Sequence, residues 1–408
     1  MDCPRIRPVE AVPIRLEGRE LVCLRDPLGL AEQPIYLNQF QLFVVSRMDG
    51  AKSLRDIQAD YCRATGEIVP VEQFDRLAEQ LNDLHYLDGE SFRVYVAGLE
   101  ESFRRMPARP ARHAGAAYEA EGERLRCQIE KFFTHPEGPG LPAGLDAVTP
   151  LQGIVAPHID FLRGGTTYAH TYKALAEQSK ADTFIIFGTC HGPMRARFAL
   201  TEKDFETPLG TVRADREFLR HASARLGGDV FAGEFAHRGE HSIEFQVVFL
   251  ACLLASRREF RIVPILVGSF HDLIAQGSNP GSNAEIAAMI RAVRETMAEL
   301  PRSYCLVAGA DLAHVGRRFG DPSGPTEATM REVERRDREF LDRVEAGEAE
   351  EVFRSIAEDR DQRRVCGYPP IYMTLSCLER PAGRLLDYRQ WVDYHAGAAV
   401  TFAGVAIY

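Results

Sequence analysis

The chain has 408 residues, of which 45% are hydrophobic and 26% charged, and its formal net charge is −10. This is the composition of a globular protein long enough for two or three domains, and its acidic balance argues against nucleic acid as the main partner. With no run of about 18 apolar residues, no apolar secretory segment at the start, and nine cysteines scattered along the chain, we expect no membrane span, no disulfide framework and a cytoplasmic location.

Residues 1–103 are predicted to form a small α+β module. Loose alternation of apolar residues over 12–24 predicts a β-hairpin. Helical spacing of apolar residues and N-cap signals predict helices over 38–48, from Ser53, and over 74–84. Two apolar segments, 86–87 and 92–96, are predicted to form a closing strand pair. This order of helices and short strands is typical of a winged-helix module.

Residues 104–112, rich in Arg, Pro and Ala, are predicted to be a linker. Residues 47–88 of the preceding module contain five Lys and Arg against nine Asp and Glu, the wrong sign for phosphate contacts. We therefore favour protein or peptide binding by this module over DNA binding, with an added strand as one mode. A purely structural appendage is the alternative.

Residues 113–408 are predicted to form an α/β domain, because strand-like and helix-like segments alternate along them. An amphipathic helix over 118–133 is followed by a Pro- and Gly-rich loop over 134–149. Strands are predicted at 152–156, 183–188, 261–268, 303–309, 384–388 and 398–408. Helices are predicted at 168–178, 216–226, 243–256, 283–300 and 327–346.

Residues that could bind a metal follow the ends of the predicted strands. His158 comes after a strand that ends at Ala156-Pro157, and His191 follows the most apolar strand of the chain. Cys366 lies in a Gly-Pro loop before a predicted helix, where a thiolate would be stabilised. Because ligands bind outside the carboxyl ends of strands in α/β sheets, we expect His158, His191 and Cys366 to form a metal site for iron, copper or zinc.

Two further groups of polar residues could serve this site. Glu240 and His241 precede a strongly apolar helix, with Glu244 and Gln246 behind them, and could support the metal ligands. Glu240 has a structural explanation as well, since it would complement the helix dipole. Asp311 and His314 are three residues apart, which would place them on one side of a helical turn, with Asp311 orienting His314 for acid/base work. The alternative is Asp311 as a helix N-cap and His314 as an exposed residue.

Seven motifs in this order resemble the Memo family, whose bacterial members are called AmmeMemoRadiSam system protein B. The first spans residues 114–133, and the other six are APHID, GTCHG, ETPLG, EHSIEFQ, ADLAHVG and CGYPP. The resemblance covers residues 113–408. It implies a three-layer α/β/α domain with a central mixed sheet, similar to the class III extradiol dioxygenases. It also implies metal ligands at His158, His191 and Cys366, with Glu240, His241 and His314 lining the same cleft.

The resemblance also bears on single residues and on a partner. His314 would match the acid/base histidine of the dioxygenases. Cys366 stands where those enzymes have a carboxylate, and some family members have a His where this chain has Gln246. The family name implies a radical-SAM enzyme as a possible partner. Residues 24–27 and 48–57 resemble the PqqD-like winged-helix domains that recognise peptides.

The sequence therefore predicts a metal-dependent oxidoreductase. Iron or copper, in preference to zinc, would be held by His158, His191 and Cys366, and dioxygen or a reduced oxygen species would take an open position. A small molecule or a peptide would be the substrate. The alternative is a non-catalytic metal- and peptide-binding protein with a vestigial dioxygenase site. A hydrolytic zinc enzyme with Glu240 or Glu244 as its base is a third interpretation.

Overall fold

The computed structural model describes residues 3–16, 18–31, 33–144, 150–194 and 196–408. The predicted loop residues 145–149 and the first two residues of the chain lie outside the described residues. The chain divides into two compact units between Arg105 and Met106. Among the described residues, no helix combines the length and the apolar character that crossing a membrane requires.

The smaller unit has an antiparallel sheet in the order β1-β2-β3, followed by helices. The strands are β1 (Glu10–Leu16), β2 (Arg19–Arg25) and β3 (Ile35–Leu37), and the helices are α1 (Gln39–Val45), α2 (Leu54–Thr65), α3 (Val71–Asp83) and α4 (Glu90–Arg105). The predicted hairpin is confirmed by the pairing of β1 with β2. Ser53 is confirmed as the N-cap of α2, where its hydroxyl accepts a hydrogen bond from the Asp56 amide.

The predicted strand pair at the end of this unit is wrong. Residues 92–96 lie inside α4, because Phe92, Val96, Leu99 and Phe103 recur at helical spacing and share one less exposed face. Leu87 forms only an isolated bridge with Ile6. The sheet of this unit thus comes before its helices. The α+β character is confirmed, whereas the winged-helix and PqqD-like assignments stay predictions.

The larger unit contains one mixed sheet in the order β12-β14-β5-β11-β6-β10-β9-β8-β4, with β13 paired to β14 and β7 to β10. Its strands are β4 (Ala108–Arg109), β5 (Gly153–Ala156), β6 (Thr183–Thr189), β7 (Phe198–Leu200), β8 (Asp204–Thr207), β9 (Gly210–Ala214), β10 (Arg261–Val267), β11 (Tyr304–Gly309), β12 (Asp311–Val315), β13 (Gly383–Asp393) and β14 (Ala398–Ile407). Neighbours from β5 to β9 are parallel, and β14 runs antiparallel to β5.

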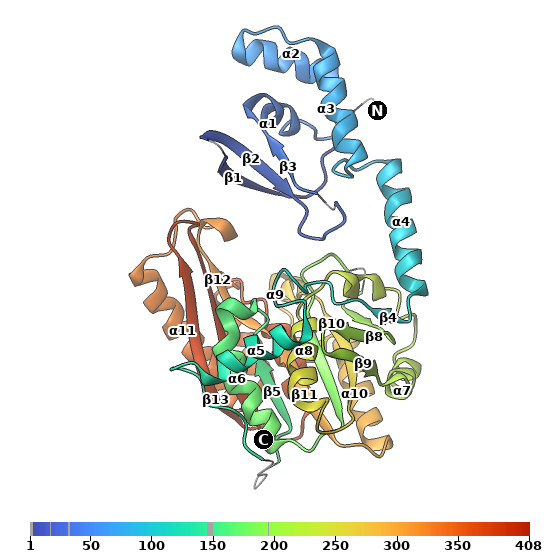
Figure 1. Ribbon diagram of the computed structural model, residues 1–408, viewed down its shortest axis with the longest axis vertical. Helices are drawn as coiled ribbons and strands as arrows, with labels where there is room; N and C mark the ends of the chain where they lie inside the picture. Colours follow the sequence, from blue (N-terminus) through green and yellow to red (C-terminus); the bar gives the residue numbers. More distant parts are fainter. Residues whose placement is uncertain (1–2, 17, 32, 145–149, 195) are drawn as a thin grey trace. The chain divides into compact units, whose positions relative to one another are not determined.

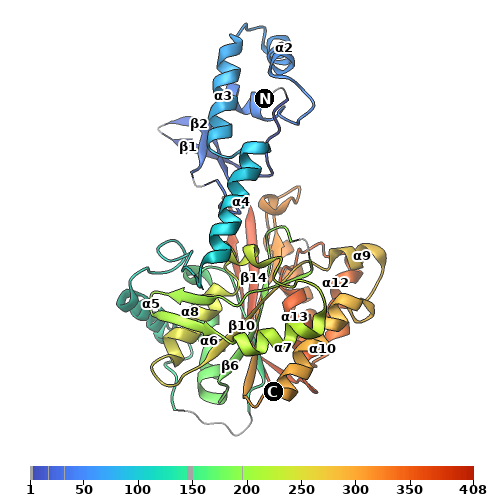
Figure 2. The ribbon, with the colours of Figure 1, turned by 90° about the vertical axis from the view of Figure 1, so that its right-hand side faces the viewer.

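Helices cover both faces of this sheet. The α-helices are α5 (Gly122–Thr134), α6 (Phe161–Gln178), α7 (Arg216–Leu226), α8 (Glu244–Leu254), α9 (His271–Gln276), α10 (Ala284–Glu299), α11 (Glu327–Glu345), α12 (Ala349–Glu358) and α13 (Tyr368–Cys377). Alternate strand residues enter two separate cores: Ile186 packs in the core with α5, α6 and α8, whereas Phe187 packs in the core with α7, α10, α12 and α13. Figure 2 shows these two groups of helices on opposite sides of the sheet. The predicted three-layer α/β/α architecture is confirmed (Figure 1).

The predicted linker 104–112 contains the division between the two units, and it includes regular structure, since Arg105 ends α4 and Ala108–Arg109 pair with β8. One predicted helix boundary is corrected. Helix α6 begins at Phe161 instead of residue 168, because the Asp160 side chain caps it. Gly164 and Gly165 therefore lie within this helix. A Cβ atom on Gly165 would lie 2.4 Å from the Phe132 ring, so this glycine lets α5 pack against α6.

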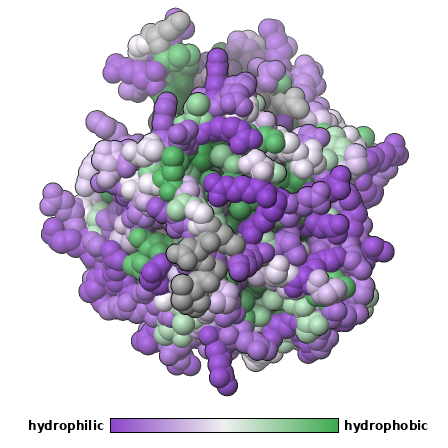
Figure 3. All heavy atoms as spheres, turned by 60° about the horizontal axis from the view of Figure 1, so that its bottom comes forward, coloured by the Kyte–Doolittle hydropathy of each residue, from purple (hydrophilic) through white to green (hydrophobic). Residues whose placement is uncertain are grey.

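Figure 3 looks onto the end of the molecule where the chain finishes. Hydrophilic side chains cover most of this face, and hydrophobic ones gather only in small areas. The pairing of β14 with β5 in opposite directions places this end at the amino ends of the parallel strands. The residues predicted to bind metal lie at the other end, where the parallel strands finish.

Candidate metal centre

Three adjacent parallel strands position the first histidines of the site. His158 lies two residues after the end of β5, and His191 lies two residues after the end of β6. Between these strands lies β11, which ends at Gly309. The carboxyl ends of parallel strands share one edge of the sheet, so both histidines come to the same place.

The structure brings a third histidine to this place. The ligand atoms of His158, His191 and His241 all lie within 4.8 Å of one another. Ligand atoms around one ion at about 2.1 Å are up to about 4.2 Å apart, so small side-chain rotations would let all three coordinate. These three residues could therefore hold a metal ion. The sequence had assigned His241 a supporting role, with Cys366 as the third ligand.

Cys366 nevertheless lies beside the cluster. Its Sγ atom is 3.3 Å from Nε2 of His158. Burial raises the pKa of the Cys366 thiol, although His191 acts in the opposite direction. Stabilisation of a thiolate by the loop itself stays a prediction, since burial favours the neutral thiol. A bound cation would have to supply the charge that deprotonates this thiol.

The Nδ1 atom of each histidine faces a group that accepts hydrogen bonds. His158 Nδ1 lies 2.9 Å from the Gly309 carbonyl oxygen, and His191 Nδ1 lies 3.1 Å from both carboxylate oxygens of Glu240. His241 Nδ1 lies 3.2 Å from Glu240 Oε1. Because these partners accept, the proton of each ring belongs on Nδ1, and Nε2 keeps its lone pair for a metal.

Glu240 is held in place by the backbone around it. Its carboxylate accepts hydrogen bonds from the amides of His191 (2.8 Å), His241 (2.8 Å) and Ser242 (3.1 Å). Burial opposes ionisation, but the charge of His191 and the hydrogen bonds that His191 donates outweigh it and hold the Glu240 pKa well below its usual value. Glu240 is thus an ionised carboxylate whose oxygens are already occupied.

Burial also sets the charge of two ring systems. It lowers the pKa of His158 and of His241 to about 3, with His191 adding to the effect for His158. Both rings are therefore neutral near pH 7, which is the form that binds metals. For His191, burial is outweighed by Glu240 and Cys366, and its pKa is raised. This ring favours the protonated form, so a bound metal would replace the proton on its Nε2 atom.

Asp311 does not orient His314 as the sequence analysis expected. Both residues lie in β12, which contains a bulge between them, so the helical spacing that would align them is absent. Asp311 Oδ1 accepts hydrogen bonds from the amides of His158 (2.8 Å) and Ile159 (3.1 Å), and Oδ2 lies 3.7 Å from His158 Nε2. His314 Nδ1 instead faces the carbonyl oxygens of Leu312 (3.1 Å) and Arg364 (3.2 Å). Asp311 therefore fixes the turn that carries His158.

Glycines let the segment with Glu240 and His241 cross the strand ends. A Cβ atom on Gly188 would lie 2.6 Å from the Ser242 hydroxyl, and one on Gly309 would lie 2.5 Å from the Ser242 carbonyl oxygen. Gln246 then ties the segment to the turn before His158, because its amide donates to Pro157 O at 2.8 Å. The side chain of Gln246 is thus part of the scaffold and contacts none of the three rings by hydrogen bonding.

The sequence analysis missed Arg109 and His113. Arg109 is fully buried, forms an ion pair with Glu244 at 2.5 Å, and donates to the Glu240 carbonyl oxygen at 2.7 Å. The His113 ring lies 5.7 Å from the His241 ring, centroid to centroid, and its Nε2 is 3.0 Å from Gly239 O. Arg109 falls in the predicted linker 104–112, and His113 follows it directly. Their positions near the site carried no periodic signal.

A cavity of about 180 Å³ opens beside the cluster. Its lining includes His191, Cys366, Tyr368, Arg364 and His271. The ring of His271 lies 2.5 Å from the carboxylate of Asp361, which raises the His271 pKa. The cavity offers access to the histidines from the side of Cys366.

Comparisons with known proteins agree with this arrangement. A family model described as Memo-like protein matches residues 109–406. The chain is 28% identical over 388 residues to a MEMO1 family protein of Aquifex aeolicus, a match that covers 94% of this chain and 95% of that protein. It is 32% identical over 304 residues to a MEMO1 family protein of Methanopyrus kandleri, covering 71% and 96% respectively. The matched region contains the histidine cluster and every residue that orients it, and the chain belongs to the Memo-like family.

Proposed function

We propose that the larger unit is a metal-dependent oxidoreductase that holds iron or copper at His158, His191 and His241, with Cys366 beside the ion. The observation that carries the proposal is the cluster itself, in which three imidazoles converge while acceptors hold their Nδ1 protons. Imidazole ligands suit iron, copper and zinc, and a neighbouring thiol favours softer metals such as Cu(I).

The two carboxylates that the hydrolytic zinc interpretation names as bases are both occupied. A hydrolytic centre would need a free base beside the metal. Both oxygens of Glu240 are occupied by amides and imidazoles, and Glu244 pairs with Arg109 and accepts a hydrogen bond from the Tyr118 hydroxyl. Neither candidate base of the hydrolytic interpretation is therefore available.

The protein residues would bind, orient and move protons around the ion. A bound iron or copper ion would supply electron transfer and a Lewis-acidic position for an oxygen species. Glu240 and Gly309 O hold the Nδ1 atoms of the ligand rings, which leaves Nε2 as the atom that would bind the ion. His314 is buried, which lowers its pKa, and its Nδ1 is engaged with backbone carbonyls. Its Nε2 is thus the atom that would take up a proton.

The size of the adjoining cavity limits the substrate. About 180 Å³ lies below the range of about 300–1,000 Å³ that is usual for drug-sized ligands. A small molecule, or one side chain of a peptide, would fit. The smaller unit would supply a peptide-binding surface by accepting a strand at β1, which pairs only with β2 among the described strands. A radical-SAM enzyme as partner stays a prediction.

Elemental analysis of anaerobically purified protein tests the proposal. We expect near-stoichiometric iron or copper in the native chain and its loss in a His158→Ala/His191→Ala variant. A His135→Ala/His395→Ala variant removes two exposed histidines and should keep the metal. If the native chain holds zinc alone or no metal, the oxidoreductase proposal fails. If iron or copper is present but no dioxygen-dependent turnover is found, the non-catalytic binding protein becomes the better interpretation.

A further inference from the structure

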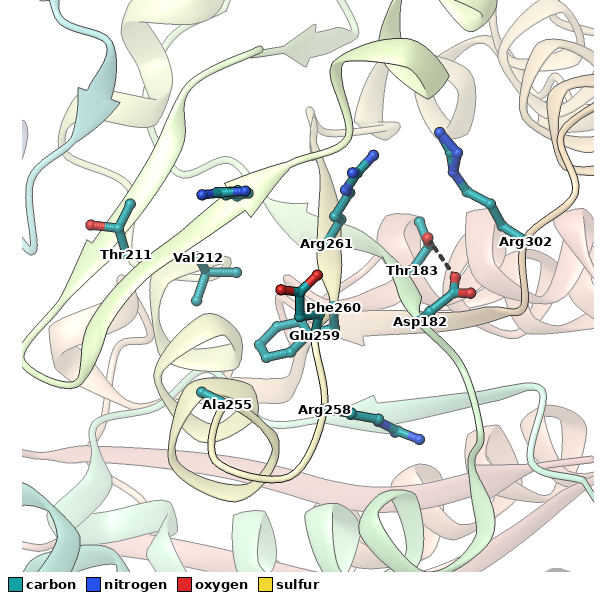
Figure 4. A pocket seen from close by; sticks show the side chains of 11 residues that line it. Asp182, Thr183, Thr211, Val212, Ala255, Arg258, Glu259, Phe260, Arg261 and Arg302 are labelled. Atoms are coloured by element: carbon teal, nitrogen blue, oxygen red, sulfur yellow. Dashed lines mark hydrogen bonds between the residues drawn. The ribbon is translucent and has the colours of Figure 1, made fainter.

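Figure 4 shows the lining of a second cavity, of about 430 Å³. This cavity lies at the opposite end of the sheet from the metal centre. Its lining includes Thr183 and Arg261, the first residues of β6 and β10, together with Arg213 of β9. Strand β6 runs from this cavity to the turn with His191, and a strand of this length spans about 20 Å. The two sites are therefore separate.

Two arginines face each other across neighbouring strands in this cavity. Arg213 and Arg261 are paired in the parallel register of β9 and β10. Backbones of neighbouring strands are about 4.8 Å apart, and like charges at facing positions are unfavourable. Both residues are exposed, and neither guanidinium has a hydrogen bond or an ion pair within the described part of the chain. The repulsion between them is thus left without a counter-charge.

Arg258 is a third cation in the cavity lining, with its side chain directed away from the Arg261 guanidinium (Figure 4). Its Nη1 donates to the Ser179 carbonyl oxygen at 2.8 Å, while its buried Nε and Nη2 atoms have no hydrogen-bond partner. Burial lowers its pKa, which means that its charge is poorly solvated. An anion in the cavity would stabilise this charge through space.

The other charged residues of the lining are either satisfied or exposed. Arg302 is paired with Asp215 at 2.7 Å and with Glu217. Asp182 accepts a hydrogen bond from the Thr183 hydroxyl at 2.9 Å. Glu259 is exposed and is not ion-paired with Arg213 or Arg261 in the described structure. Its carboxylate is the internal competitor for those two arginines.

We infer that this cavity binds a small molecule whose phosphate or carboxylate group is held by Arg213 and Arg261. Guanidinium groups bind both oxyanions through paired N–H donors, which explains why two unpaired arginines stand together. Phe260 also lines the cavity and could contact the body of the ligand, although its ring is directed away from the Arg261 guanidinium (Figure 4). The volume lies in the usual range for a small-molecule site.

Calorimetric titration of the full-length, metal-loaded chain tests this inference. The probes are inorganic phosphate, phenyl phosphate and benzoate, each at constant ionic strength set with chloride. We expect phenyl phosphate or benzoate to bind, and the stronger of the two identifies the anionic group. Inorganic phosphate should bind more weakly than phenyl phosphate if contact with Phe260 adds to the affinity.

Three variants locate the binding. Arg213→Gln/Arg261→Gln should raise the dissociation constant about tenfold or more. Arg291→Gln/Arg318→Gln makes the same charge change at exposed positions outside the cavity and should leave binding unchanged. Glu259→Gln should tighten binding, because it removes the competing carboxylate. Metal content should be the same in all of them.

Stability without ligand gives a second readout. At low ionic strength the Arg213→Gln/Arg261→Gln variant should unfold at a higher temperature than the native chain, because the repulsion is relieved. Absence of saturable binding of all three probes would overturn the inference. So would equal binding by the native chain and the double-arginine variant.

Discussion

At the scale of single residues, one carboxylate organises two of the three imidazoles. Glu240 contacts Nδ1 of both His191 and His241 and accepts hydrogen bonds from three backbone amides. Such a carboxylate behind a ligand fixes ring orientation and raises ligand basicity. A neutral amide in its place would offer one acceptor oxygen and an NH₂ group that cannot accept from Nδ1–H.

Glu240→Gln should therefore weaken metal affinity about 10- to 100-fold while the fold persists. Competition with a chelator of known affinity measures the change. The matched control is Glu358→Gln, which alters an exposed glutamate far along the chain and should leave affinity unchanged. Unchanged affinity in the Glu240 variant would mean that the backbone alone orients the rings.

Buried His237 gives a residue-scale prediction about pH. Its Nε2 lies 2.9 Å from Ala199 O, and burial lowers its pKa to about 3. An unfolded histidine titrates near 6.5, so the unfolded chain binds this proton more readily. The stability contributed by neutral His237 is complete above about pH 6.5 and is lost as pH falls toward 3.

The comparison with His237→Gln isolates this effect. Between about pH 6 and pH 4, acidification should reduce the unfolding free energy of the native chain by about 1.4 kcal/mol per pH unit more than that of the variant. Urea unfolding at several pH values measures the difference, since all other titrating groups are common to both chains. Parallel pH profiles would show that His237 is protonated in the folded state.

At the scale of elements, the site depends on a segment that lies across strand ends. The residues from Glu240 to Ser242 precede α8 and pass close to Gly188 of β6 and Gly309 of β11. A side chain at either glycine would meet backbone or buried side-chain atoms, which cannot move without moving the segment. Because Gly309 of β11 has no side chain, this strand leaves room for the segment from Glu240 to Ser242.

Gly309→Ala should displace this segment and lower metal content, with a loss of about 1–3 kcal/mol in unfolding free energy. Its new Cβ atom would lie 2.5 Å from Ser242 O. Gly98→Ala, the same substitution in helix α4, meets nothing within 4 Å and should be neutral or slightly stabilising. Metal analysis and urea unfolding of both variants test the contrast, and full metal content in Gly309→Ala would contradict it.

At the scale of the whole molecule, the boundary between the two units determines which residues belong to the unit that carries the metal centre. The larger unit begins at Met106, and β4 with its buried Arg109 belongs to it. Arg109 pairs with Glu244 and donates to the carbonyl oxygens of His237 and Glu240. The match of 94% of the chain to the Aquifex aeolicus protein extends into the smaller unit as well.

A fragment of residues 106–408 should fold and hold metal like the full chain, whereas 113–408 should not. The shorter fragment lacks Arg109 and leaves Glu244 buried without its counter-charge, which costs about 3–5 kcal/mol. Urea unfolding and metal analysis of both fragments measure the difference. The full-length Arg109→Met variant should reproduce the defect, and equal stability of the two fragments would contradict the role of β4.

Particular residues show which parts of the fold and of the site could be predicted from the sequence. His158 and His191 were predicted from strand ends followed by polar turns, and the capped helix at Ser53 from its neighbours. Each is a local signal. Phe92–Val96 was misread because its apolar residues suit a strand or a helix equally over five positions. Asp311 and His314 were misread because their spacing implied a helix where the chain forms a bulged strand.

The sequence alone determined the α/β architecture, the family resemblance and the strand ends that carry His158 and His191, because periodicity and turn chemistry are written in neighbouring residues. Tertiary structure alone decided that His241 completes the cluster, that Glu240 serves two rings, and that Arg109 lies buried behind them. These relations join segments about 50 to 130 residues apart. Which side chains meet over such distances depends on strand order, and only the folded sheet sets that order.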